Sequence, residues 1–149
     1  MSAVSVRLEG LPGCSRPRVD HGRAHLGKTY TAWRKAAHAT IAAARLQPIA
    51  GAVEVHIAVV VASPMVPALR RGRGRVGFVG RPDLDNAVKG CLDALQGAGV
   101  LADDAQVVAL TVHRVRGAVA PHQAPYARDA RERSCCEVTV PPLEVSDVG

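Results

Sequence analysis

The chain has 149 residues and a formal net charge of +6. Hydrophobic residues make up 48% of it and charged residues 21%, which favours one globular domain and excludes an intrinsically disordered chain. No apolar run approaches the ~18 residues of a membrane span, and the first residues lack the pattern of a signal peptide. We therefore expect a cytoplasmic protein that makes no membrane contact.

Hydrophobic periodicity predicts six regular elements in the order β, α, β, α, β, β. They are the strands 3–9, 52–62, 106–115 and 134–140 and the helices 30–46 and 85–96. The intervening segments 10–29, 63–82 and 116–133 are rich in Gly, Pro and charged residues and are predicted to be loops. Two helices on one face of a four-stranded mixed sheet fit this order, so we predict a single α+β domain. It covers residues 1–142, and 143–149 form a frayed tail.

The cysteines and histidines point to no cofactor. Cys14, Cys91, Cys135 and Cys136 lack the spacing of a zinc site, so we expect reduced, partly buried thiols. The six histidines form no catalytic pattern, and those of the predicted strands should face outward. Because the sequence also has no phosphate-binding or dinucleotide-binding glycine motif, we expect no organic cofactor.

Charge is distributed unevenly along the chain. Residues 1–82 contain thirteen Lys or Arg and three acids, whereas residues 83–149 contain six and ten. A basic half indicates a polyanionic partner, with nucleic acid the leading candidate, although the alternative of a solvated surface remains open. The candidate DNA-binding residues are Arg16, Arg18, Arg23 and Lys28 in the first predicted loop and Arg70, Arg71, Arg73, Arg75 and Arg81 in the second.

Negative charge gathers at both ends of the second predicted helix. Asp83 and Asp85 precede and open it, Lys89 follows one turn later, and Asp103 and Asp104 stand before the next strand. Carboxylate oxygens are the ligands that Mg²⁺ prefers, and three of them from two segments would suffice for one or two ions. Three simpler readings stay open: a helix cap at Asp85, a surface ion pair between Asp85 and Lys89, and a polar turn at the later aspartates.

The stretch 81–108, "RPDLDNAVKGCLDALQGAGVLADDAQVV", closely resembles the RusA family of Holliday junction resolvases, which are crossover junction endodeoxyribonucleases. The family's signature has a basic residue, Asp-x-Asp-Asn, a Lys four residues after the second Asp, an apolar "LDAL" run and Asp-Asp before a strand. Every element of this signature is present. Upstream, "SRPRV" at 15–19 and "YTAWRKAA" at 30–37 resemble the basic N-terminal segment of many members.

The resemblance implies metal binding by Asp83, Asp85 and Asp104, a catalytic role for Lys89 and a supporting role for Asn86. It further implies an α+β fold, a homodimer and dependence on Mg²⁺, with Mn²⁺ as a substitute. The expected function is an endonuclease that resolves four-way DNA junctions by paired symmetric nicks, in recombination and repair, within a bacterial or phage-infected cell. A less specific branched-DNA nuclease and a non-catalytic junction-binding module are the two alternatives.

Overall fold

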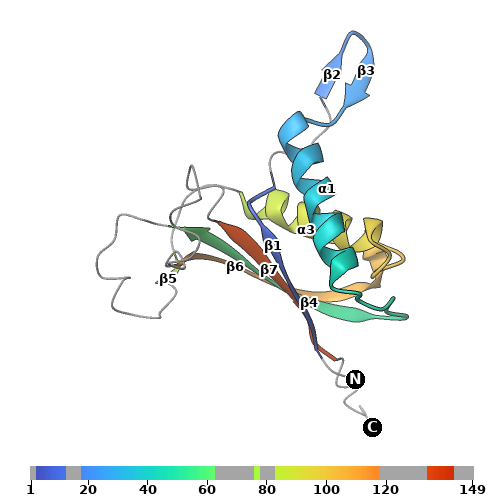
Figure 1. The fold of residues 1–149 in the computed structure, drawn as a ribbon, viewed down its shortest axis with the longest axis vertical. Helices are drawn as coiled ribbons and strands as arrows, with labels where there is room; N and C mark the ends of the chain where they lie inside the picture. Colours follow the sequence, from blue (N-terminus) through green and yellow to red (C-terminus); the bar gives the residue numbers. More distant parts are fainter. Residues whose placement is uncertain (1–2, 13–17, 63–75, 78–82, 118–133, 143–149) are drawn as a thin grey trace.

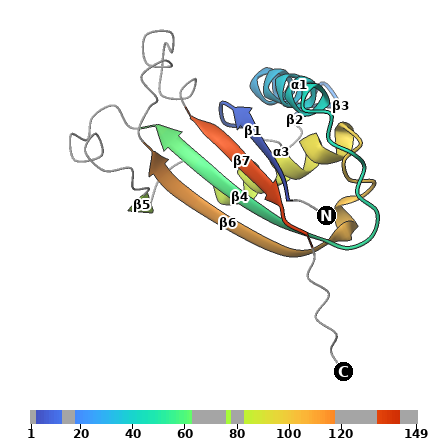
Figure 2. The same cartoon turned by 60° about the horizontal axis from the view of Figure 1, so that its bottom comes forward.

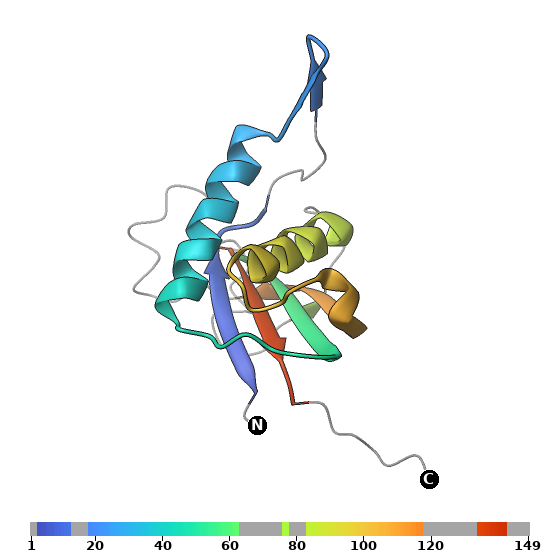
Figure 3. The same cartoon turned by 90° about the vertical axis from the view of Figure 1, so that its right-hand side faces the viewer.

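The computed structural model describes residues 3–12, 18–62, 76–77, 83–117 and 134–142. It is an α+β domain with two helices on one face of a mixed β-sheet, as the sequence predicts (Figure 1). The helices are α1 (Lys28–Ala43) and α3 (Leu84–Gly97). Seen from the side, both helices lie over the same face of the sheet (Figure 3). The predicted fold class is confirmed.

The sheet has four long strands and one short strand, in the spatial order β1-β7-β4-β6-β5 (Figure 2). They are β1 (Val4–Glu9), β4 (Val53–Ala62), β5 (Val76–Gly77), β6 (Val107–Gly117) and β7 (Cys135–Val140). Strands β4 and β6 are parallel, and the other neighbouring pairs of this sheet are antiparallel. Because a parallel pair needs a crossover, the chain passes from β4 to β6 through α3.

Alternation along the strands builds the core on the helix side of the sheet. In β4, Val55 and Ile57 are buried, whereas the side chains of Glu54 and His56 point to the other face. His56 Nε2 lies 2.6 Å from Glu54 Oε1 there, and His113 of β6 is also exposed, so the predicted outward histidines are confirmed. The helices contribute the buried side chains of Tyr30, Trp33, Ala37, Ile41, Ala87, Cys91, Ala94 and Leu95.

The two helices approach each other closely at Gly90 of α3. A Cβ atom at this position would lie 2.7 Å from Pro12 Cβ and 3.3 Å from Trp33 Cζ3, so no larger residue fits without a shift of its neighbours. The close contact brings the α1 side chain of Tyr30 within hydrogen-bonding distance of Asp93 on α3.

The segment 10–29, predicted to be a loop, contains a β-hairpin of β2 (Arg18–Asp20) and β3 (Arg23–His25). The hairpin projects beyond the N-terminal end of α1 (Figure 1). Its turn has positive φ at His21 (47°) and Gly22 (75°), the pattern of a type I′ turn. The prediction failed here because strands of three residues show no measurable hydrophobic alternation.

The helix ends differ from the predicted ends by a few residues. Helix α1 begins at Lys28, two residues early, because Gly27 supplies its N-cap, and it ends at Ala43, near the left-handed φ of 52° at Arg45. Helix α3 ends at Gly97, and Gly99 adopts a φ of 77°, as the predicted helix stop requires.

Cys91, Cys135 and Cys136 are buried free thiols, which confirms that part of the cysteine prediction. Cys14, the predicted loop residues 118–133 and the predicted tail 143–149 lie outside the described residues. Within the part of the chain that the structure describes, no helix is long and apolar enough to cross a membrane.

Candidate active site

The start of α3 presents two carboxylates to solvent. Asp83 is the N-cap residue, with extended backbone angles, and its side chain makes no capping hydrogen bond. Asp85 lies in the first helical turn and is exposed, as Asp83 is. The helix-cap reading of Asp85 is therefore wrong, because the cap position belongs to Asp83. Leu84, between the two, packs against the core and anchors the start of the helix.

Asp103 and Asp104 differ in their contacts. Asp103 is the N-cap of the short 3-10 helix η1 (Asp104–Gln106), and its carboxylate accepts a hydrogen bond of 2.7 Å from the Ala105 N–H. Asp103 therefore belongs to a polar turn, which was one of the simpler interpretations of this aspartate pair. Asp104 is exposed in the first turn of η1, where its carboxylate faces solvent. This division supports Asp104 over Asp103 as the ligand candidate.

Gln106 holds the turn that carries Asp104. Its Nε2 donates to the carbonyl oxygens of Ile49 (2.9 Å) and Gly51 (2.7 Å), in the segment that leads into β4. Its Oε1 accepts from the N–H groups of Ala102 (2.7 Å) and Asp103 (3.2 Å). One amide side chain therefore ties η1 to a segment more than fifty residues away, which fixes the backbone that bears Asp104.

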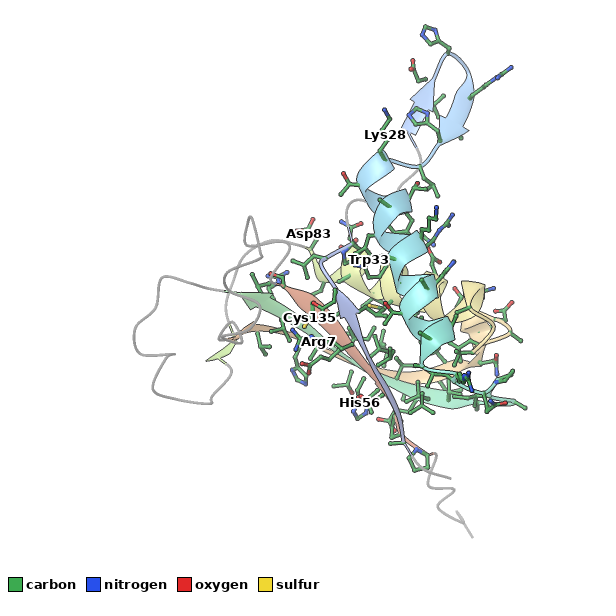
Figure 4. All side chains as sticks on the ribbon, in the orientation of Figure 1. Arg7, Lys28, Trp33, His56, Asp83 and Cys135 are labelled. Atoms are coloured by element: carbon green, nitrogen blue, oxygen red, sulfur yellow. The ribbon has the colours of Figure 1, made fainter. Side chains whose placement is uncertain are left out.

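A single chain does not gather the three predicted ligands. Asp83 lies at one end of α3 (Figure 4), and the η1 turn lies at the other end. A helix of 14 residues is about 20 Å long, and the Val100 N–H bonds the Leu95 carbonyl (2.9 Å), which keeps the following turn at the C-terminal end. Among the described residues, no group of three His, Cys, Asp or Glu is placed to hold a metal ion.

Lys89 lies on α3, one turn after Asp85, and its side chain is 58% exposed. Its Nζ atom lies 3.3 Å from Oδ1 of Asp93, one turn further along the helix. Asn86 is half-buried in the first turn. The candidate base or charge-stabilising group is thus on the same helix as the first two carboxylates, and Asp93 is its acidic partner.

The candidate DNA-binding residues are only partly described. Arg23 on β3 and Lys28 at the start of α1 are exposed, and Figure 4 places Lys28 near the base of the hairpin. Arg18 lies in β2, but its side chain is outside the described set. The residues Arg16, Arg70, Arg71, Arg73, Arg75 and Arg81 also lie outside it.

The donor chemistry of this region fits a hard divalent cation. Asp83 and Asp85 offer two neighbouring, exposed carboxylates, and Mg²⁺ commonly takes one or two protein carboxylates and completes its coordination with water and substrate phosphate. Asp104 can serve as a third ligand only if it comes from another molecule, because α3 separates Asp104 from Asp83 and Asp85 within one chain. A carboxylate pair beside a lysine supplies the groups that metal-assisted phosphodiester hydrolysis uses: ligands for the ion and a positive charge for the phosphate.

A protein-family model described as "Endodeoxyribonuclease RusA" matches residues 9–122, a span that contains all the candidate carboxylates and Lys89. The chain belongs to the RusA endodeoxyribonuclease family. A search of curated proteins finds none that matches it. The family match ends before β7, although β7 is the strand that joins β1 to β4 and completes the sheet.

Proposed function

We propose that this protein is a divalent-metal-dependent endonuclease that resolves Holliday junctions by paired symmetric nicks, during recombination and repair. The observation that carries the proposal is the exposed pair Asp83 and Asp85 at the start of α3, with Lys89 one turn later, in a member of an endodeoxyribonuclease family. The metal is Mg²⁺, with Mn²⁺ as a substitute. Since its substrate is DNA, we also propose that the protein acts in the cytoplasm of a bacterial or phage-infected cell.

The metal site is composite in this proposal. Asp83 and Asp85 of one copy supply two ligands, and Asp104 of a second copy supplies the third, because one chain holds these groups at opposite ends of α3. A two-fold axis makes the arrangement reciprocal, so that a homodimer has two equal sites. Two equal sites match a substrate that needs two symmetric cuts.

Each residue of the site has a distinct role. The bound ion would lower the pKa of a coordinated water and neutralise charge on the scissile phosphate. Lys89 donates hydrogen bonds to a phosphate oxygen and stabilises the charge that develops there. Asn86 orients a carboxylate or contacts the phosphate. Cleavage leaves a 5′-phosphate and a 3′-hydroxyl.

The basic residues hold the DNA backbone. Arg23 and Lys28 are exposed at the hairpin and at the start of α1, and the arginines between residues 70 and 81 lie close in sequence to Asp83. Arginine binds phosphate with a planar, two-pronged geometry. Phosphate contacts and DNA shape then supply most of the affinity, with a strong dependence on salt.

A cleavage assay tests the function. Wild-type protein and Asp85→Asn are incubated with a synthetic four-way junction and with flap, fork and linear duplexes, in Mg²⁺, Mn²⁺ or chelator. We expect symmetric nicks in the junction only with wild-type protein and metal. Equal cutting of flaps and forks favours the less specific nuclease. A wild-type protein that binds the junction without cutting it in either metal favours the non-catalytic module.

Mixed dimers test the composite site. Asp85→Asn and Asp104→Asn are each expected to abolish cleavage. In a mixed dimer, one site carries both substitutions and the other carries neither, so we expect co-expressed chains to regain single nicks. If all three ligands came from one chain, both sites of the mixed dimer would be damaged, and no activity would return.

A further inference from the structure

Asp93 links a surface lysine to a buried tyrosine. One of its carboxylate oxygens, Oδ1, lies 3.3 Å from Lys89 Nζ, and the other, Oδ2, accepts a hydrogen bond of 2.5 Å from the Tyr30 hydroxyl. The Asp93 side chain is 28% exposed and the Lys89 side chain 58%. The carboxylate therefore connects the exposed face of α3 to the core between α3 and α1.

Tyr30 is a buried hydrogen-bond donor. Tyr30 is only 1% exposed. Its ring stacks on that of Trp33, with 6.5 Å between the ring centroids, and the Arg34 guanidinium lies 5.8 Å from the Tyr30 ring centroid. Burial and the hydrogen bond to Asp93 raise the pKa of Tyr30 above its ordinary value, so its hydroxyl keeps its proton. The position of the Asp93 carboxylate is thus fixed from a second helix.

Helix stability does not account for this arrangement. An exposed ion pair four residues apart contributes only about 0.3–0.5 kcal/mol, and it contributes most when the acid precedes the base. Here the base, Lys89, precedes the acid, Asp93, which is the less favourable order. The Asp93 carboxylate instead links the Lys89 ammonium to the buried Tyr30 hydroxyl.

We infer that Asp93 and Tyr30 are positioning residues that hold Lys89 for its reaction with the scissile phosphate. The inference rests on the proposed function. A free lysine samples many rotamers of its four-carbon stem, whereas a lysine held at one donor keeps two further N–H groups for a phosphate oxygen. Fixing the ammonium before the substrate arrives lowers the entropy cost of reaching the transition state.

The experiment measures single-turnover cleavage of a four-way junction in Mg²⁺, and junction affinity in Ca²⁺. Asp93→Asn can still accept the Tyr30 hydrogen bond but loses its charge, and Tyr30→Phe loses only the hydroxyl. We expect each to lower the cleavage rate, by about tenfold for Asp93→Asn, with junction affinity unchanged within about twofold. Glu54→Gln removes the same charge from a carboxylate that contacts His56 on the opposite face of the sheet, and it should leave both quantities unchanged.

The decisive comparison uses Lys89→Ala. If Asp93 acts through Lys89, adding Asp93→Asn to Lys89→Ala causes no further loss of rate. An equal loss in both backgrounds, or no loss in the wild-type background, overturns the inference while wild-type cleavage still supports the proposed function. A wild-type protein that cuts no junction overturns both. If Tyr30→Phe does not fold, Asp93→Asn and the double substitution still decide the question.

Discussion

Gln106 shows how one side chain can position a candidate ligand that it does not touch. Four hydrogen bonds of its side-chain amide join η1 to the residues just before it and to residues 49–51. We predict that Gln106→Glu destabilises the protein by about 1–3 kcal/mol, because a carboxylate oxygen would then face two carbonyl oxygens. Gln96→Glu is the matched control, because Gln96 makes a single long bond of 3.5 Å to Ala102. Urea unfolding of both variants checks this, and equal losses of stability would contradict it.

The buried thiols make stability sensitive to alkaline pH. Burial raises the pKa of Cys135 to about 11, and a hydrogen bond to Cys136, together with burial, raises that of Cys91 well above its usual range. A thiol whose pKa is raised on folding stabilises the folded state. This stabilisation is fully present at pH values below the unfolded pKa, near 9, and it is lost as the pH rises toward the folded pKa.

Replacing Cys135 with Val removes one of these thiols. Between pH 8 and pH 10 we expect Cys135→Val to lose about 1 kcal/mol less unfolding free energy than the wild type loses. Urea titrations at the two pH values measure the difference. Parallel losses in the two proteins would show that ionisation of Cys135 does not contribute.

At the scale of elements, the β2–β3 hairpin is an exposed surface that a partner could contact. His21, Arg23 and His25 are exposed, and the left-handed φ of 47° at His21 is uncommon for a residue other than glycine. A short two-stranded ribbon is only marginally stable alone. The described side chains of the hairpin do not pack in the core. A surface role of this kind agrees with its proposed contact with DNA.

We predict that Arg23→Ala weakens junction binding and reduces the slope of log affinity against log salt concentration by about 1, because one phosphate contact is lost. Thermal stability should not change, since the side chain is exposed. Lys35→Ala is the matched control, because it removes one positive charge from the exposed face of α1. Binding titrations at several salt concentrations measure both slopes, and identical slopes would count against a hairpin contact.

The long elements could be predicted from sequence because each has its own periodicity. Strand β4 and helix α3 have many apolar positions in phase, and both were placed correctly within a residue or two. The hairpin was missed because its signal is a His-Gly turn between three-residue strands. Local pattern decides an element only when the element is long enough to repeat it.

The candidate site was predicted as residue types and not as geometry. Asp83, Asp85 and Asp104 stand out as acids in a basic chain, yet their separation depends on the direction of α3 relative to η1. The contact between Tyr30 and Asp93 joins residues 63 positions apart, and no local pattern encodes it. Sequence thus predicted which residue types could form the site, whereas the packing of α1 on α3 determined which groups meet.

For the whole molecule, we propose that β6 is the surface that meets a second copy. Val108 is 64% exposed and Leu110 is 43% exposed, and both lie close in sequence to the turn that bears Asp104. In the described part of the sheet, β5 pairs with β6 only at Val115 and Arg116, so the rest of that edge has no neighbouring strand. Exposed apolar side chains beside an unpaired strand edge are features of a protein interface.

A charge placed on this surface should separate the proposed dimer. We predict that Val108→Glu shifts the protein from twice 15.6 kDa to the mass of one chain and abolishes junction cleavage, because each metal site then lacks the Asp104 of the second copy. Val19→Glu is the matched control, since Val19 is 74% exposed on the hairpin and should leave the mass unchanged. Sedimentation equilibrium gives the masses, and circular dichroism verifies that both variants fold. A folded Val108→Glu dimer with full activity would place the interface elsewhere, whereas an active monomer would refute the composite site itself.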